Sequence, residues 1–310
     1  MNSQAPQLSV VIVVASDARH LKGCLEALTQ QVDPPYLEII VPYLAHDEEV
    51  VALQSQFPSV RWHPVDKLLT VVNQPKPAHE HLNELRATGL SLALGDIIVL
   101  TEDHARPDRR WARNIVQEHK DSSAAIGGAI ENEVDRLLNW AVYFCDFSRY
   151  QNPVQTTPSR FLTDANVSYK RLALEKVKEV WRSAYHETEV HDALAARNQV
   201  LRLSPNIVVY QHREKLNLWR ALKERIEWAR SYAAFRAKQI TPARRLFYLT
   251  FSPGLVFLLT GRKIAAIARK KRLIREFIKA FPLTALLTLF WSYGELLGYL
   301  TGRCEPTSKT

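Results

Sequence analysis

Three side chains able to bind a cation or carry a proton stand together near the middle of the chain: Glu102, Asp103 and His104. They follow Ile97-Ile98-Val99-Leu100, an unbroken apolar run typical of a strand buried on both faces. In open α/β sheets, ligands bind outside the carboxyl ends of the strands. These residues are therefore predicted to lie at a ligand-binding sheet edge, where carboxylate and imidazole suit Mn²⁺ or Mg²⁺. The plain alternative is an acidic turn with no ligand.

The neighbouring elements are predicted from residue spacing. Leu85, Gly89, Leu92 and Ala93 repeat at helical spacing, and Gly95 is expected to end this helix in the left-handed conformation. Apolar strands at 8–14, 37–41 and 60–62 alternate with helices at 20–30 and 48–56, which favours a parallel sheet. Further on we predict a helix at 112–119, a strand at 124–128 ending in a glycine pair, a strand pair around Pro205, and helices starting near residues 172 and 187.

The order of helix, Gly-Asp, apolar strand, acidic triplet, Pro107 and Trp111 resembles the centre of family 2 glycosyltransferases of the GT-A fold. The opening segment SVVIVVASDARHLKGCLEALTQQ resembles the first strand and helix of that family. The resemblance implies an α/β, Rossmann-like, mostly parallel sheet with flanking helices, and a nucleotide-sugar donor bound with a divalent metal. In the family a D-x-D element closes the central strand. Here Glu102 and His104 occupy its two positions, which is a departure from the family pattern.

The same resemblance implies roles for individual residues. Donor contacts fall on Ala15, Ser16, Asp17, Arg86, Glu102 and Asp103, and metal contacts on His104, Asp103 and His212. Contacts to the acceptor fall on Asp164, Asn166 and His186, with an Asx-turn as the structural alternative for the first two. The family's general base is a carboxylate at the start of a helix, which Glu187 or Glu189 supplies, with a slight preference for Glu189. Acids also cap helix N-termini without catalysing anything.

The C-terminal part of the chain differs in composition from the rest. The net charge is +9, and Lys and Arg crowd the segment 213–279. After a long basic helix at 216–239 come two apolar stretches, 246–260 and 281–300, that contain no Lys or Arg. Because the segment between them is strongly basic, an interfacial hairpin on the cytoplasmic face of the membrane is favoured over two full spans. A nucleic-acid partner is disfavoured, because the positive charge lies beside apolar stretches.

Together these observations predict a catalytic domain at 1–239 and a helical membrane-associating hairpin at 240–310. The predicted protein is an inverting glycosyltransferase of cell-envelope polysaccharide or glycolipid biosynthesis, with a lipid-linked or glycan acceptor. Two alternatives stay open: a membrane adaptor that kept the fold without the chemistry, and a nucleotidyltransferase. Against the latter, Ala15 to Arg19 do not form a glycine-rich phosphate loop.

Overall fold

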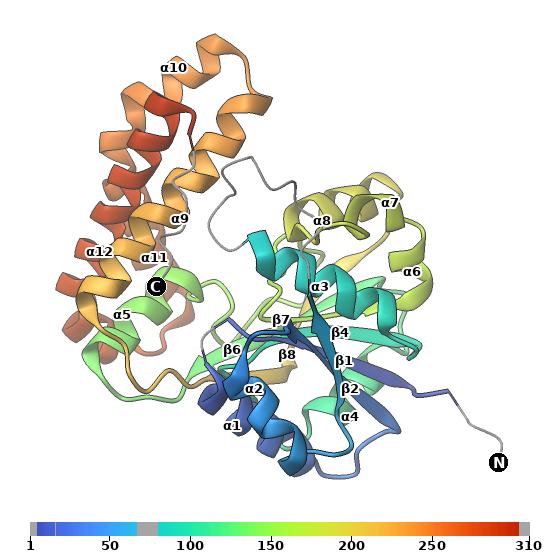
Figure 1. Ribbon diagram of the computed structural model, residues 1–310. Helices are drawn as coiled ribbons and strands as arrows, with labels where there is room; N and C mark the ends of the chain where they lie inside the picture. The colour runs from blue at the N-terminus through green and yellow to red at the C-terminus, as the bar shows by residue number, and fades with distance from the viewer. Residues whose placement is uncertain (1–4, 16, 67–79, 304–310) are drawn as a thin grey trace. The chain divides into compact units, whose positions relative to one another are not determined.

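The computed structural model describes residues 5–15, 17–66 and 80–303. Within them, eight strands form one mixed sheet in the order β3-β2-β1-β4-β7-β6-β8-β5, so the predicted α/β class is confirmed (Figure 1). The strands are β1 (Leu8–Val13), β2 (Leu37–Leu44), β3 (Arg61–Val65), β4 (Ile97–Glu102), β5 (Ala105–Pro107), β6 (Ala125–Asn132), β7 (Asn166–Lys170) and β8 (Leu201–Gln211).

The first four strands of that order are parallel, as the alternating pattern predicts. They are joined by α1 (Ala18–Thr29), α2 (Glu48–Leu53) with the short η1 (Gln54–Gln56), and α3 (Glu80–Leu92). Figure 1 shows α1, α2 and α4 (Trp111–Glu118) on one face of the sheet and α3 on the other, with α6 (Arg171–Glu175), α7 (Lys178–Trp181) and α8 (Glu187–Ala196). Residues 97–100 of β4 are all buried, because helices cover both faces.

The second half of the sheet differs from the sequence prediction in three places. β7 is a strand that was not expected, and it runs antiparallel to β4 and β6. β6 does not end at its glycine pair but continues to Asn132. The segment around Pro205 is one strand rather than a pair, with a register shift opposite Gly128. A Cβ on Gly128 would lie 2.0 Å from Asn166 Nδ2, so this glycine admits a neighbouring side chain rather than a ligand.

Gly95 also has a different role from the one predicted. It is not left-handed; within the described residues the one glycine with positive φ is Gly302. A Cβ on Gly95 would lie 2.6 Å from the backbone nitrogen of Ser9, and the Gly95 N–H donates to Ser9 Oγ at 2.6 Å. Close passage beside β1, rather than helix capping, is what requires glycine here.

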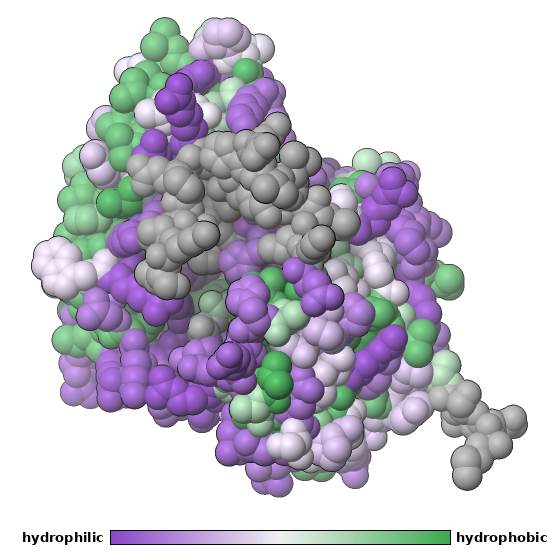
Figure 2. All heavy atoms as spheres, in the orientation of Figure 1, coloured by the Kyte–Doolittle hydropathy of each residue, from purple (hydrophilic) through white to green (hydrophobic). Residues whose placement is uncertain are grey.

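A second compact unit contains α5 (Leu137–Asp146), α9 (Leu218–Gln239), α10 (Pro242–Phe251), the short η2 (Ser252–Gly254), α11 (Leu255–Lys270) and α12 (Ile274–Thr301). In the described part of the chain this unit comprises Glu80, residues 134–149 and residues 213–303, so the long basic helix α9 groups with the C-terminal helices and not with the sheet. The predicted boundary at residue 239 lies inside this unit. Figure 2 shows apolar side chains gathered over the upper part of this unit, where Figure 1 labels α10, and polar ones at its lower end.

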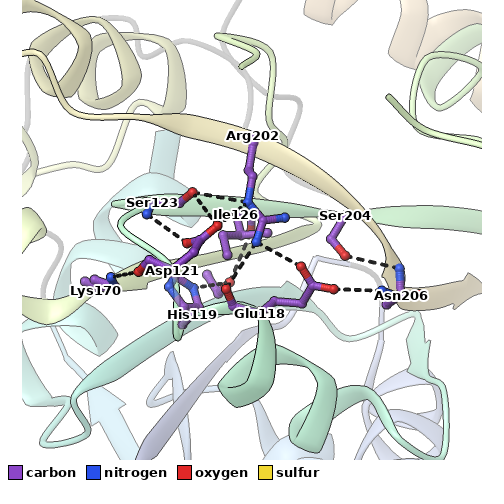
Figure 3. A network of polar contacts seen from close by, with 10 residues as sticks. Glu118, His119, Asp121, Ser123, Ile126, Lys170, Arg202, Ser204 and Asn206 are labelled. Atoms are coloured by element: carbon purple, nitrogen blue, oxygen red, sulfur yellow. Dashed lines mark hydrogen bonds and ion pairs between the residues drawn. The ribbon is translucent and has the colours of Figure 1, made fainter. Parts of the chain in front are cut away.

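A polar network centred on Arg202 connects residues at the end of the sheet where the parallel strands start (Figure 3). Its guanidinium binds Glu118 Oε2 and Asp121 Oδ2, each at 2.8 Å. Glu118 also accepts from Asn206 Nδ2 at 2.7 Å, and Lys170 donates to the carbonyl of Asp121. Because Arg202 and Lys170 pair with the residues that begin β6 and β4, this network lies at the edge where the parallel strands start.

Candidate active site

The acidic triplet lies at the carboxyl ends of the parallel strands, opposite the network around Arg202, where β4 ends beside β1. The Asp103 N–H donates to the carbonyl of Val13 at 3.1 Å, and Asp103 Oδ2 accepts from the backbone N–H of Asp17 at 3.0 Å. His104 lies between the two acids, with Nδ1 3.0 Å from Asp103 Oδ1 and Nε2 3.2 Å from Glu102 Oε2. The predicted grouping of these three residues at a sheet edge is therefore present in the structure.

Arg86 joins this triplet to a second group of acids. It lies on α3, is buried, and places Nη2 3.2 Å from Glu102 Oε1 and 2.9 Å from Asp164 Oδ2. Arg86 is therefore not a solvated arginine on the helix surface. Asp164 reaches this position because β7 is antiparallel, so the residues before that strand lie at the edge where β4 ends.

Glu187 completes the cluster from the first turn of α8. Its Oε2 accepts the backbone N–H of Asp164 at 2.9 Å. Glu189, two residues further along the same helix, is exposed and outside the cluster. Of the two predicted bases, the structure brings Glu187 to the other acids. We refer below to Arg86, Glu102, Asp103, His104, Asp164 and Glu187 as the acid cluster.

The environment of the acid cluster alters the pKa of its members. Burial, followed by the charge of Asp164, raises the pKa of Glu187 to about 8. Burial also raises the pKa of Asp164, although Arg86 opposes this. Burial alone would lower the pKa of His104, but the Glu102 carboxylate and a hydrogen bond to Asp103 outweigh it and raise that pKa to about 9. Glu187 is therefore a stronger base than an ordinary carboxylate.

Other predicted contact residues have structural partners. Asp17 caps α1 by accepting the N–H of His20, and Ala15 lies two residues beyond the end of β1 and is half-buried. Ser16 lies outside the described residues. Asn166 is buried, donates to the carbonyls of Ala129 and Ile207, and accepts from Trp111 Nε1. The structure thus gives the Asn166 side chain a role in tying three strands and α4 together.

His186 and His212 lie at the margins of the site. His186 precedes α8, with Nδ1 3.4 Å from Asn83 Nδ2. His212 donates its backbone N–H to the carbonyl of His104 at 2.8 Å, while its Nδ1 lies 2.8 Å from Glu133 Oε2. Among residues 5–15, 17–66 and 80–303, no group of three or more His, Cys, Asp or Glu side chains is arranged to hold a metal. The predicted ligands His104, Asp103 and His212 are therefore not gathered into one such group.

Sequence reasoning missed the residues that support the acid cluster. Asn83, one helical turn before Arg86, accepts from Arg86 Nη1 at 3.1 Å, and its carbonyl accepts the N–H of Tyr185 at 2.9 Å. The Tyr185 hydroxyl lies 2.5 Å from that of Tyr169, which lies 2.6 Å from His191 Nε2. The i, i+3 spacing of Asn83 and Arg86 was a usable signal. The pair of Tyr169 and Tyr185 had no signal in the sequence, because it depends on strand β7, which was not predicted.

Comparison with known proteins gives distant likenesses. No family model matches the chain, and no curated protein matches it in sequence. Among solved structures, it is similar to the mannosyltransferase PcManGT from Pyrobaculum calidifontis in complex with GDP-Man and Mn²⁺, at 14% identity and a TM-score of 0.49, over 97% of this chain and 86% of that one. It is also similar to residues 1–349 of S. aureus TarS in complex with UDP-GlcNAc, at 11% identity and a TM-score of 0.48, over 96% of this chain and 92% of that one. At such distances the activity of this chain has to be argued from its own residues.

Proposed function

We propose that this chain is a nucleotide-sugar-dependent glycosyltransferase whose active centre is the acid cluster. The observation that carries the proposal is the continuous contact from Glu102 through Arg86 and Asp164 to Glu187. This contact joins the acids at the end of β4, where we expect the donor to bind, to the carboxylate of Glu187 on α8. A group-transfer enzyme needs both parts within reach of one substrate pair.

Glu187 is the proposed general base. The acceptor oxygen would attack the anomeric carbon while Glu187 takes its proton, and the bond from that carbon to the diphosphate oxygen would break. A single displacement of this kind inverts the anomeric centre. A carboxylate with a pKa of about 8 accepts a proton more readily than an ordinary glutamate. Glu189 is exposed and has no comparable position.

Charge balance supports a divalent cation in the donor complex. The acid cluster holds four carboxylates against Arg86 and a protonated His104, an excess of two negative charges when all are ionised. A diphosphate would be repelled from such a centre unless a cation offset that charge. Mg²⁺ and Mn²⁺ at phosphate sites commonly use one or two carboxylates plus substrate oxygens, so a three-ligand protein group is not required. Glu102, with Asp103 and His104 beside it, would hold the ion, which would stabilise the departing diphosphate.

Arg86 is the proposed positioning group for the donor. Its guanidinium is held by two carboxylates from different segments, so its place is fixed before any ligand arrives. Because Asp164 and Glu102 keep the Arg86 pKa above its usual value despite burial, its positive charge is permanent. It can therefore stabilise negative charge that develops on the leaving group.

The proposals for the acceptor and for the cellular location are based on the C-terminal helices. Two helical segments are apolar and long enough to cross a membrane by length and composition, Pro242–Lys270 and Ile274–Thr301. We propose that they hold the enzyme at the cytoplasmic face of the cell membrane, on the side where a cytosolic nucleotide-sugar donor would reach the acid cluster. A lipid-linked acceptor in cell-envelope polysaccharide or glycolipid biosynthesis would be presented at that surface.

The test is turnover by the full chain in detergent. UDP- and GDP-sugars would be offered with Mn²⁺ and with polyprenyl phosphate or glycolipid acceptors, and release of nucleoside diphosphate and glycosylated lipid would be measured. Glu187→Gln should lose turnover, and Glu189→Gln is the matched control that should keep it. No turnover from a folded chain across these sugars would favour the non-catalytic adaptor. Release of pyrophosphate from nucleoside triphosphate and a sugar phosphate would favour a nucleotidyltransferase.

A further inference from the structure

Within the described residues of the second compact unit, few side chains of the segment from α10 to α11 are buried. No residue of α10 is buried, and in η2 and α11 the buried ones are Ser252, Lys263 and Ile267. Its exposed side chains include large apolar residues, among them Leu246 (63% exposed), Phe251 (60%) and Phe257 (80%). An apolar surface of this extent marks an interaction site.

α12, in contrast, packs against the charged helix α9 and the apolar helix α5. Gly294 and Gly298 bring its backbone against α9, since a Cβ on them would lie 2.5 Å from the Ile226 carbonyl oxygen and 2.4 Å from that of Arg230. Near its start, the Phe277 ring packs on Phe144 of α5 with 5.0 Å between centroids. Its exposed large apolar residues, Ile274, Ile278, Leu289, Tyr293 and Leu300, are left on the remaining surface.

The helix α9 cannot follow α12 into a bilayer core at low cost. Over 22 residues α9 carries eight charged side chains, namely Arg220, Lys223, Glu224, Arg225, Glu227, Arg230, Arg236 and Lys238. The glycine contacts put residues 226–234 of α9 directly against residues 294–298 of α12. If α12 spanned the membrane, these charges would be carried to hydrocarbon depth.

We infer that α10, α11 and α12 attach the chain to one leaflet of an anionic bilayer without crossing it. This rests on the membrane association proposed above and defines its form. Charge complementarity identifies an anionic lipid surface as the partner, because seven exposed basic residues accompany the apolar surface: Arg244, Arg262, Arg269, Lys271, Arg272, Arg275 and Lys279. Apolar side chains would enter the interface while the basic ones contact anionic headgroups.

Labelling of single cysteines decides between attachment and spanning. In the full chain with Cys145 and Cys304 replaced by serine, Arg269→Cys reports on the turn between α11 and α12, and Arg182→Cys reports on the sheet unit; both positions are exposed, and the remaining Cys24 is fully buried. Sealed membrane vesicles of both orientations would be treated with an impermeant maleimide. Attachment to one leaflet predicts that both cysteines are labelled from the same side.

The outcomes separate this inference from the proposed function. Labelling of the two cysteines from opposite sides would overturn it. Labelling of both from the cytoplasmic side supports it. Labelling of both from the outer side would also support one-sided attachment but would overturn the proposed cytoplasmic location. Turnover in detergent should be unchanged in both variants, because neither residue belongs to the acid cluster.

Vesicle sedimentation tests the lipid surface itself. With phosphatidylcholine vesicles containing phosphatidylglycerol, Phe251→Ser should weaken binding roughly tenfold, whereas Phe161→Ser, equally exposed at 60% but on the sheet unit, should not. The double variant Arg269→Gln/Arg275→Gln should lose binding on these vesicles and not on phosphatidylcholine alone. Equal binding of all variants, or pairing of the chain with a second copy through this surface in lipid-free solution, would contradict the inference.

Discussion

Two polar clusters lie at opposite edges of the same sheet, and their charges are balanced differently. In the network around Arg202, every charged group faces an opposite charge or a hydrogen bond, and hydrogen bonds from Asn206 and Arg202 overcome burial to lower the pKa of Glu118. In the acid cluster, carboxylates outnumber cations, and burial with the Asp164 charge raises the pKa of Glu187 to about 8.

The difference separates a stabilising network from a site kept ready for a ligand. A balanced network lowers the free energy of the folded chain and has nothing to gain from a further ion. An unbalanced one costs stability in the free protein and recovers it when a cation or a proton arrives. Variants that change one cluster at a time should therefore separate activity from stability.

The largest expected effect is on turnover. Glu187→Gln keeps the size of the side chain and an oxygen for the Asp164 N–H, but removes the basic carboxylate. We expect kcat to fall by roughly 10²-fold or more, since a positioned base contributes on that order. Melting temperature should not fall, because the lost charge was disfavoured by burial. Wild-type kcat in this variant would remove Glu187 from the mechanism.

Breaking the network around Arg202 should lower stability and leave turnover unchanged, the reverse of Glu187→Gln. Arg202→Met leaves Glu118 and Asp121 without their cation. Removing one partner of a buried pair costs about 3–5 kcal/mol, and because the Asp121 side chain is 43% exposed we expect about 2 kcal/mol here. Thermal or denaturant unfolding measures this loss, while kcat should stay near that of the wild type. A large loss of kcat without a loss of stability would mean that the two clusters are not independent.

The pH dependence of stability should differ in sign between the clusters. Glu187 has a folded pKa of about 8 against an ordinary value of 4.5, so the unfolded chain releases its proton first and stability falls as pH rises through that window. Glu118 has a lowered pKa, so its stabilisation is present above 4.5 and is lost as pH falls. The fall in melting temperature between pH 4.5 and about 8 should be weaker in Glu187→Gln, and the fall below pH 4.5 should be weaker in Arg202→Met. Unchanged pH profiles in both variants would argue against these pKa shifts.

Local pattern in the sequence was enough to predict the parallel half of the sheet. Apolar runs such as residues 97–100 and the helical spacing before them depend on neighbours along the chain, and β1, β2, β4 and α3 are present in the structure. The start of α8 at Glu187 and the grouping of Glu102, Asp103 and His104 were predictable for the same reason.

What could not be predicted depends on contacts between distant segments. β7 has a short, half-polar sequence, Asn-Val-Ser-Tyr-Lys, and is a strand because β4 and β6 flank it. Its antiparallel direction is what brings Asp164 to Arg86, and with it Glu187 rather than Glu189. The burial of Arg86 likewise follows from tertiary packing and has no signal in a lone arginine on a helix.

The smallest expected effect is a rise in melting temperature with Mn²⁺, and it tests the charge imbalance directly. A cation that binds only the folded chain at tenfold its Kd should add roughly 1.4 kcal/mol of stability. Because it would offset the excess negative charge, it should also lower the Glu187 pKa, so that binding releases protons measurable by calorimetry in buffers of different ionisation enthalpy. Glu102→Gln should abolish the response, since it removes the most accessible carboxylate of the triplet, whereas Glu118→Gln in the balanced network should keep it. A response that survives Glu102→Gln and disappears in Glu118→Gln would show that the cation binds in the network around Arg202. That network, and not the acid cluster, would then be the ligand site.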